Sequence, residues 1–175
     1  GHGFLLSQFI SPLFNNRKDD YGGPIEARAK IVIEIIDEVR SAVGTLFPIG
    51  IRINSSDQLD GGLTESEALN FIRLLDKTSV DLIDISGGTY FPGAKASSDS
   101  SADGVYFLNF AQSARKITDI PLMVTGGFKT RKQAIEALEV GATDIIGLGR
   151  AMILNPQLPE AWFSGTGRDP EFPKF

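Results

Sequence analysis

The stretch IPLMVTGGFKT, residues 120–130, decides the fold class of this chain. Its apolar first half predicts a β-strand at 120–124. The glycine pair at 126–127 ends that strand, and Thr130 with Gln133 forms a capping box that begins a helix. A strand that passes through a glycine turn into a helix is typical of a βαβ unit. The stretch therefore predicts a parallel sheet covered by helices.

The rest of the chain repeats this alternation. Short segments rich in isoleucine and valine predict three further strands, at 49–53, 80–86 and 143–148. Apolar periodicity and capping residues predict helices over the following segments: 25–43 after Pro24, the segment begun by the capping box of Thr64 and Glu67, 107–117, the segment from Thr130 to Gly141, and 151–154.

Strands that alternate with helices give an α/β fold, either an open doubly wound sheet or part of a TIM (β/α)8 barrel. A full barrel typically takes about 250 residues, and this chain has 175. Four strands would make about half of a barrel. We therefore expect residues 1–175 to form a single partial domain, with a loose tail over 164–175 that is rich in glycine and proline.

Composition excludes several classes of protein. The net charge is −5, which disfavours a nucleic-acid or membrane partner, because both select for a basic face. The absence of cysteine excludes disulfides, thiolate metal sites and cysteine nucleophiles, and a single histidine excludes a histidine-cluster metal site. We expect no metal site. With no signal peptide or membrane span in the sequence, a cytoplasmic location is the default expectation.

Polar residues gather where the predicted strands end. In the first strand the isoleucines alternate with Arg52, which places Arg52 on the opposite face, toward the centre of a barrel. The alternative is a surface arginine on an edge strand. Ser86 and Gly87 end the second strand and leave room for a ligand, unless they form a plain turn. Barrel enzymes place their sites at these carboxyl ends.

The last two strands both end in glycine and lead into a helix, through Gly126-Gly127 and through Gly149-Arg150. Glycine lets backbone N–H groups approach a phosphate, and an arginine adds a charge-assisted hydrogen bond. We therefore expect a phosphate site here, with two plain glycine turns as the alternative. Three acidic residues lie in or beside strands, and we expect them to cap or pair at strand starts: Asp81, Asp84 and Asp144. The alternative is that a buried carboxylate among them acts as a base.

The opening of the chain carries a denser pattern. It reads HGFLLSQFISP over residues 2–12, and a spaced set follows: Asn15, Arg17, Asp19, Tyr21, Gly22, Gly23, Glu26 and Arg28. This pattern closely resembles the Old Yellow Enzyme family of FMN-dependent NAD(P)H:flavin oxidoreductases, which are (β/α)8 barrels. The later features follow in the family's order. The resemblance implies that this chain is the C-terminal half of the barrel, strands five to eight.

The resemblance also implies roles. Gly126, Gly127, Gly149 and Arg150 match the family's FMN phosphate cradle. Arg52 matches the arginine beside the flavin ring, and His2 matches a member of the pair that holds the carbonyl oxygen of the substrate. Ser86 and Gly87 are expected to contact the cofactor as well. The implied activity passes hydride from NAD(P)H through FMN to an α,β-unsaturated carbonyl or a related small-molecule acceptor.

One departure from the family concerns the residue that donates a proton to the substrate. Phe4 stands where alkene-reducing members commonly have a tyrosine that donates a proton, and phenylalanine has no donor. Tyr90 is a candidate substitute. Ala27 also replaces a common asparagine. The first four strands of a barrel are missing, so we expect an incomplete chain that needs a missing N-terminal half-barrel or forms a homo-oligomer.

Other functions fit part of the pattern. The same flavin barrel also serves amine dehydrogenases and dienoyl-thioester reductases, which differ around the flavin. A phosphosugar isomerase, lyase or synthase would use both glycine pairs without a flavin, but it leaves the segment 15–28 unexplained. A truncated copy without activity is the third alternative.

Overall fold

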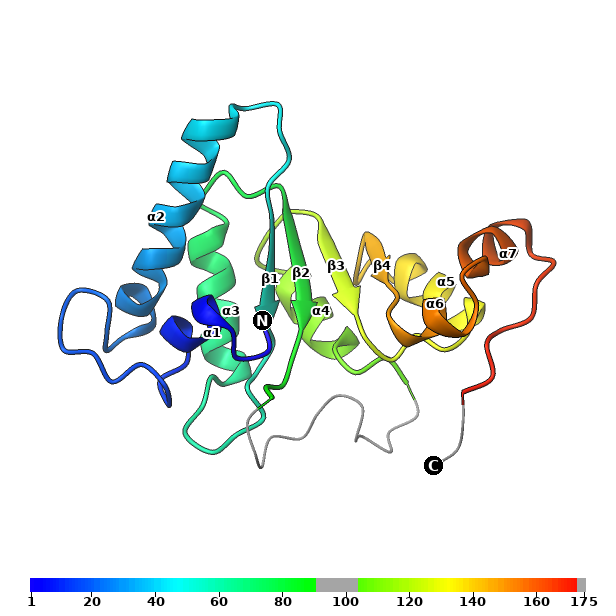
Figure 1. The fold of residues 1–175 in the computed structure, drawn as a ribbon, viewed down its shortest axis with the longest axis horizontal. Coiled ribbons are helices and arrows are strands. Elements are labelled where there is room, and N and C mark those ends of the chain that lie inside the picture. Colours follow the sequence, from blue (N-terminus) through cyan, green and yellow to red (C-terminus); the bar gives the residue numbers. More distant parts are fainter. Residues whose placement is uncertain (91–103, 173–175) are drawn as a thin grey trace.

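Four parallel strands form one sheet in the computed structural model, which describes residues 1–90 and 104–172. The strands are β1 (Gly50–Asn54), β2 (Leu82–Ser86), β3 (Leu122–Thr125) and β4 (Ile145–Gly147). They lie in the order β1-β2-β3-β4, and all arrows point the same way (Figure 1). This sequential order is that of a barrel segment, whereas a doubly wound sheet reverses its order at a switch point. All four predicted strands are confirmed, and each predicted boundary lies within two residues of the observed one.

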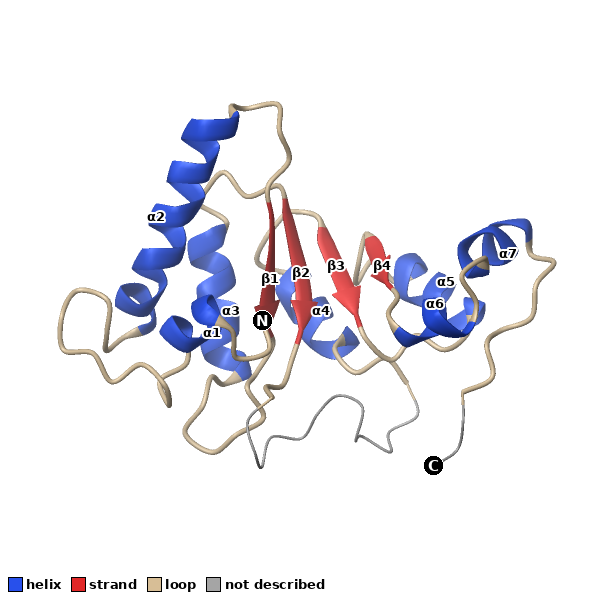
Figure 2. Ribbon diagram, viewed as in Figure 1, coloured by secondary structure: helices blue, strands red, loops and turns tan. Residues whose placement is uncertain are grey.

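The helices alternate with the strands and follow the predicted segments (Figure 2). Their bounds are α1 (Leu5–Ile10), α2 (Ile25–Val43), α3 (Glu65–Leu75), α4 (Leu108–Arg115), α5 (Arg131–Glu139), α6 (Arg150–Leu154) and α7 (Leu158–Ser164). Both predicted capping boxes form, at Thr64 with Glu67 and at Thr130 with Gln133. Helices α1 and α7 were not predicted. Each is under eight residues long and lacks a side-chain cap, and unlike the equally short α6 neither directly follows a predicted strand.

The core lies between one face of the sheet and the helices. Ile83 and Ile85 of β2, with Leu122 and Val124 of β3, are fully buried. They alternate with Leu82, Asp84 and Ser86 in β2 and with Met123 and Thr125 in β3, so the opposite face is polar toward the carboxyl ends of these strands. Helices contribute many of the other buried apolar side chains, including Val32, Phe71, Ile72, Leu75, Phe110 and Leu158.

The tail that was expected to be loose contacts the rest of the domain over the residues that the structure describes. Residues 165–172 contain no helix or strand. The Asp169 carboxylate accepts a hydrogen bond of 2.8 Å from the backbone N–H of Arg131, and Phe172 packs against the core. Trp162 of α7 is buried, as expected of a packing residue. Residues 173–175 lie outside the described part of the chain.

Asn15 fixes the connection between α1 and α2 from inside. Its side-chain amide donates to the carbonyl oxygens of Phe9 at 2.7 Å and Tyr21 at 2.6 Å. Its side-chain oxygen accepts from the backbone N–H of Arg17 at 3.2 Å. One buried side chain therefore satisfies backbone groups that have no partner in a helix or strand. This residue of the family pattern serves the fold.

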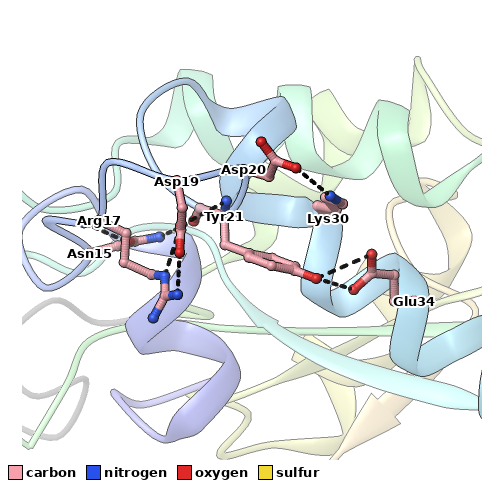
Figure 3. Close-up of polar contacts among 7 residues, drawn as sticks. All are labelled: Asn15, Arg17, Asp19, Asp20, Tyr21, Lys30 and Glu34. Carbon is pink, nitrogen blue, oxygen red and sulfur yellow. Dashed lines mark hydrogen bonds and ion pairs between the residues drawn. The ribbon is translucent and has the colours of Figure 1, made fainter.

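The outer side of the same connection is held by charged groups (Figure 3). Arg17 pairs with Asp19, and the Tyr21 hydroxyl donates to Glu34 of α2 at 3.1 Å. The guanidinium of Arg17 also lies 5.8 Å from the ring centre of Tyr21. These contacts hold the segment against α2, so most of the spaced pattern in the opening is structural.

Carboxylates fix the starts of two strands. Asp81, just before β2, accepts from the backbone N–H of Ile49 at 2.8 Å and pairs with Arg40 from the last turn of α2. Asp144, just before β4, likewise accepts from the N–H of Leu122 at 2.8 Å and pairs with Arg115 at the end of α4. The expected role at strand starts is thus confirmed for both residues.

The same expectation is wrong for Asp84. It lies in the middle of β2, opposite Arg52 in the register of the two strands. Its side chain is on the polar face of the sheet and bonds to other side chains, so it caps no strand.

Among the described residues, no helix is long and apolar enough to cross a membrane.

Replacement of Asp81 by asparagine tests the strand-start contacts. The hydrogen bond from the backbone N–H of Ile49 is the main cause that holds the pKa of Asp81 below its ordinary value of 3.8, and the hydrogen bond from Arg40 adds to it. A carboxyl group whose pKa is lower in the folded state stabilises above its unfolded pKa, and this stabilisation is lost as pH falls through the folded pKa. We expect Asp81→Asn to lower the thermal unfolding midpoint at pH 7 by a few degrees, and the difference from wild type to shrink below pH 3.8.

Thermal unfolding of the complete protein at pH 7 and at pH 3 measures this difference. Asp37→Asn is the matched control, because Asp37 is an exposed carboxylate in α2. An equal loss of midpoint in both variants would contradict the role given to Asp81.

Candidate functional site

The predicted site residues come together at the carboxyl ends of the strands. All four strands end at one edge of the sheet, and the start of the chain lies beside the end of β1 (Figure 1). The backbone N–H of His2 donates to Asn54 Oδ1 at 2.8 Å, and His2 forms a parallel β-bridge with Thr89. His2 is therefore held at the same edge as the glycine turns that follow β3 and β4.

Arg52 lies on the polar face of the sheet, as its alternation with the isoleucines predicted. Ile51 and Ile53 are buried against the helices, whereas the Arg52 side chain is 46% exposed. Its Nε donates to Asp84 Oδ2 at 2.5 Å, and Thr125 Oγ1 donates to Asp84 Oδ1 at 2.8 Å. Three neighbouring strands thus contribute one linked row of polar side chains.

A second polar row lies one step nearer to the carboxyl edge. Asn54 and Ser86 are paired in the register of β1 and β2, and both are buried. The Asn54 amide donates to Asp57 Oδ1 at 3.0 Å and to the carbonyl oxygen of Gly88 at 3.1 Å. The Ser86 hydroxyl donates to the carbonyl oxygen of Ile53 at 3.1 Å. This row holds the loops after β1 and β2 together.

Three aromatic rings gather above this edge. The Tyr90 ring stacks on the His2 imidazole with 5.8 Å between their centres, and the Phe4 ring meets Tyr90 edge-on at the same separation. His2 has a positive φ of 61°, an uncommon conformation for a residue with a side chain. Contacts with Asn54 of β1 and with Thr89 and Tyr90 of the loop after β2 therefore hold His2 in a specific orientation.

Burial is the main cause that lowers the pKa of the His2 imidazole, and nearby positive charge, including that of Arg52, lowers it further. The negative charge of Asp84 opposes this effect. His2 is consequently a neutral imidazole at pH 7, with one ring N–H available as a donor.

The two glycine turns differ in what surrounds them. A Cβ on Gly127 would lie 2.5 Å from the carbonyl oxygen of Gly104, and Gly127 has a φ of +84°, so only glycine fits. A Cβ on Gly149 would meet no atom within 4 Å. Gly149 therefore borders open space at the start of α6. Within the described residues, no backbone acceptor is present for the N–H groups of Gly126, Gly127, Gly149 and Arg150.

The space at Gly87 is filled by protein. A Cβ there would lie 2.6 Å from the Phe107 ring and 2.9 Å from the Ser55 hydroxyl. Phe107 also contacts the position that a Cβ on Gly126 would take, at 3.3 Å. The sequence suggested that Gly87 leaves room for a ligand, but its missing side chain makes room for the buried ring of Phe107.

Sequence reasoning missed Asn54 and Thr125 as parts of the site and misplaced Asp84. Each lies on the same alternating face as Arg52 or Ser86. Counting every second residue from Arg52 and from Ser86 would have found Asn54 and Asp84, while Thr125 required the register between β2 and β3.

Comparison with known proteins agrees with this arrangement. Residues 1–166 match the model of the NADH:flavin oxidoreductase / NADH oxidase family. The NADH-dependent flavin oxidoreductase iliE of Hypocrea jecorina is 36% identical over 168 residues, a match that covers 91% of this chain and 42% of that protein. The chain thus spans less than half the length of this curated relative.

Solved structures show the same fold. A 2-naphthoyl-CoA reductase superposes with a TM-score of 0.84 at 30% identity, over 93% of this chain and 25% of that one. The Old Yellow Enzyme homologue of Zymomonas mobilis superposes with a TM-score of 0.74 at 21% identity, over 98% of this chain and 46% of that one. The four strands therefore correspond to part of a TIM barrel. With a family match over nearly all of its length, this chain belongs to the NADH:flavin oxidoreductase / NADH oxidase family, which is the Old Yellow Enzyme family.

Proposed function

We propose that the protein containing this chain is an FMN-dependent oxidoreductase that passes hydride from NAD(P)H to an α,β-unsaturated carbonyl or a related acceptor. The observation that carries this proposal is the position of His2 and the two glycine turns at the carboxyl edge of the sheet, with Arg52 on the polar face two residues before the end of β1. Family membership supports the use of FMN and NAD(P)H. When bound, FMN would accept hydride from one substrate and deliver it to the other.

The glycine turns fit the phosphate of FMN. The open space at Gly149 and the N–H groups of Gly149 and Arg150 lie at the start of α6, where partial positive charge favours an anion. Gly126 and Gly127 follow the neighbouring strand β3 at the same edge of the sheet. Arg150 is exposed and makes no ion pair with any described residue, so its guanidinium is available to a phosphate. We assign Gly126, Gly127, Gly149 and Arg150 to this cradle. Ser86 and Gly87 shape the loop beside it.

The polar face of the sheet fits the flavin ring of FMN and the substrate that accepts hydride. Arg52 places a positive charge on the inner face, where it would stabilise negative charge that develops on reduction. His2, as a neutral imidazole, would donate its ring N–H to a carbonyl oxygen of the acceptor. Such a hydrogen bond draws electrons from the conjugated double bond and favours hydride addition at its far carbon.

Tyr90 is the proposed source of the proton. After hydride adds to the β-carbon of the acceptor, the α-carbon needs a proton. Phe4 offers none, whereas the Tyr90 ring contacts both His2 and Phe4. The Tyr90 hydroxyl would give its proton to the α-carbon and regain one from water, because this residue is 78% exposed.

We also propose that further strands complete the barrel. Strands β1 and β4 are the two edges of the sheet, and Ile145 of β4 is 43% exposed. Beside β4 lies an apolar groove lined by Ile146, Leu148 and Trp162 among others. Unpaired strand edges and apolar surface of this kind are normally covered. We propose that an N-terminal half-barrel of the same protein packs against these edges and this groove. A second copy of this chain is the alternative.

The visible spectrum of the complete purified protein tests the proposed function. We expect the absorption bands of oxidised flavin, and we expect NADH or NADPH to bleach them without oxygen present. A colourless, folded protein that FMN cannot reconstitute would refute the proposal and favour a sugar phosphate as the ligand of the glycine turns.

Replacement of Arg150 by glutamine tests the phosphate cradle. We expect FMN affinity to fall about tenfold, the loss expected from one charge-assisted hydrogen bond. The dissociation constant is measured by fluorescence titration of the apoprotein with FMN. Riboflavin, which has no phosphate, should bind wild type and variant equally. Arg73→Gln on the outer surface of α3 is the control. Unchanged FMN affinity in Arg150→Gln would exclude Arg150 from the cradle.

Replacement of Tyr90 by phenylalanine tests the proton source. We expect the rate of acceptor reduction to fall about a hundredfold, the usual contribution of a general acid, while NAD(P)H reduces the flavin at the wild-type rate. Stopped-flow absorbance separates these two half-reactions. Adding Phe4→Tyr to the same variant should restore acceptor reduction. Equal rates in wild type and Tyr90→Phe would show that water supplies the proton.

A further inference from the structure

Asp84 is a buried carboxylate to which the proposed reaction gives no role. Its side chain is only 8% exposed, and it lies in the middle of β2 on the inner face of the sheet. Removing a carboxylate from water costs several kcal/mol unless partners compensate. A residue in this position therefore needs strong contacts, and those contacts indicate what it does.

Both oxygens of Asp84 bond to side chains of neighbouring strands. One accepts from Arg52 Nε at 2.5 Å, and the other accepts from Thr125 Oγ1 at 2.8 Å. Asp81 and Asp144 differ, because each accepts from a backbone N–H at the amino edge and so fixes a strand start. Among the described residues, Asp84 accepts from no backbone group, so it orients side chains and fixes no strand start.

The contact between Asp84 and Arg52 leaves the two terminal NH2 groups of the arginine available. Only Nε of Arg52 donates to Asp84. Neither terminal NH2 group of Arg52 has a hydrogen-bond partner in the described part of the chain, and the side chain is 46% exposed. An arginine held through Nε keeps a fixed plane and can still donate two hydrogen bonds to another group. Thr125 fixes the orientation of the Asp84 carboxylate, which in turn holds Arg52.

We propose that Asp84, oriented by Thr125, is a positioning residue that holds the Arg52 guanidinium toward the flavin ring and thereby favours binding of reduced over oxidised FMN. The proposal rests on the proposed function, because it takes FMN as the bound group. The fixed plane of Arg52 matters since a preorganised charge stabilises developing negative charge without the cost of reorienting.

The test is the midpoint potential of FMN bound to the complete protein, which reports the ratio of affinities for reduced and oxidised FMN. We expect Asp84→Asn to lower that ratio about tenfold, because Arg52 loses its charge-assisted hydrogen bond and its fixed plane. Arg52→Met should lower the ratio at least as much, and the double variant should equal Arg52→Met. Thr125→Val should shift the ratio in the same direction by a smaller factor.

Asp144→Asn is the matched control, because it also removes a carboxylate paired with an arginine, but at the amino edge of the sheet. It should leave the ratio unchanged. A higher ratio in Asp84→Asn would overturn the proposal, since it would show that Asp84 only offsets the charge of Arg52. An unchanged ratio would overturn it as well.

If Asp84→Asn does not fold, Thr125→Val decides the question, because it leaves the carboxylate and its charge in place. An unchanged ratio in that variant would then overturn the proposal. A wild-type protein that binds no FMN would refute the proposed function and this inference together, whereas bound FMN with unaltered ratios would refute the inference alone.

Discussion

The polar face of the site depends on the alternation of side chains along β1 and β2. Successive residues of a strand point to opposite faces, so the isoleucines that bury one face leave Arg52 and Asp84 on the other. A shift of one residue in the pairing would bury the arginine among helices and expose Ile51. The apolar face therefore fixes the register, and the register assembles the polar row.

Much of this arrangement could be predicted because its signals are local. Thr64 and Thr130 begin helices through contacts made within four residues, and alternation within five residues placed Arg52 on the inner face. The roles of Asp81 and Asp144 followed from their positions before a strand. Helices α1 and α7 carried no comparable signal, since both are short, lack a side-chain cap and do not directly follow a predicted strand.

The parts that sequence could not give are long-range. The contacts of Asp84 join β1, β2 and β3, and they depend on register, which no single strand encodes. Gly87 shows a different limit. A glycine looks the same in a sequence whether a ligand or a protein side chain fills the space beside it. At Gly87 that space is filled by the Phe107 ring. Only the packed structure separates these two explanations.

The sheet divides its acidic residues between two tasks. At the amino edge, Asp81 and Asp144 bond to backbone N–H groups and to arginines near the ends of α2 and α4, so their charge holds the chain in place. Toward the carboxyl edge, Asp84 bonds only to side chains among the described residues and leaves the end of Arg52 available. Parallel strands bring all their carboxyl ends to one edge, and this separation lets that edge change its chemistry while the opposite edge maintains the fold. The arginines follow the same division, because Arg40 and Arg115 are satisfied by carbonyl oxygens and carboxylates, whereas Arg52 and Arg150 retain donors for a ligand.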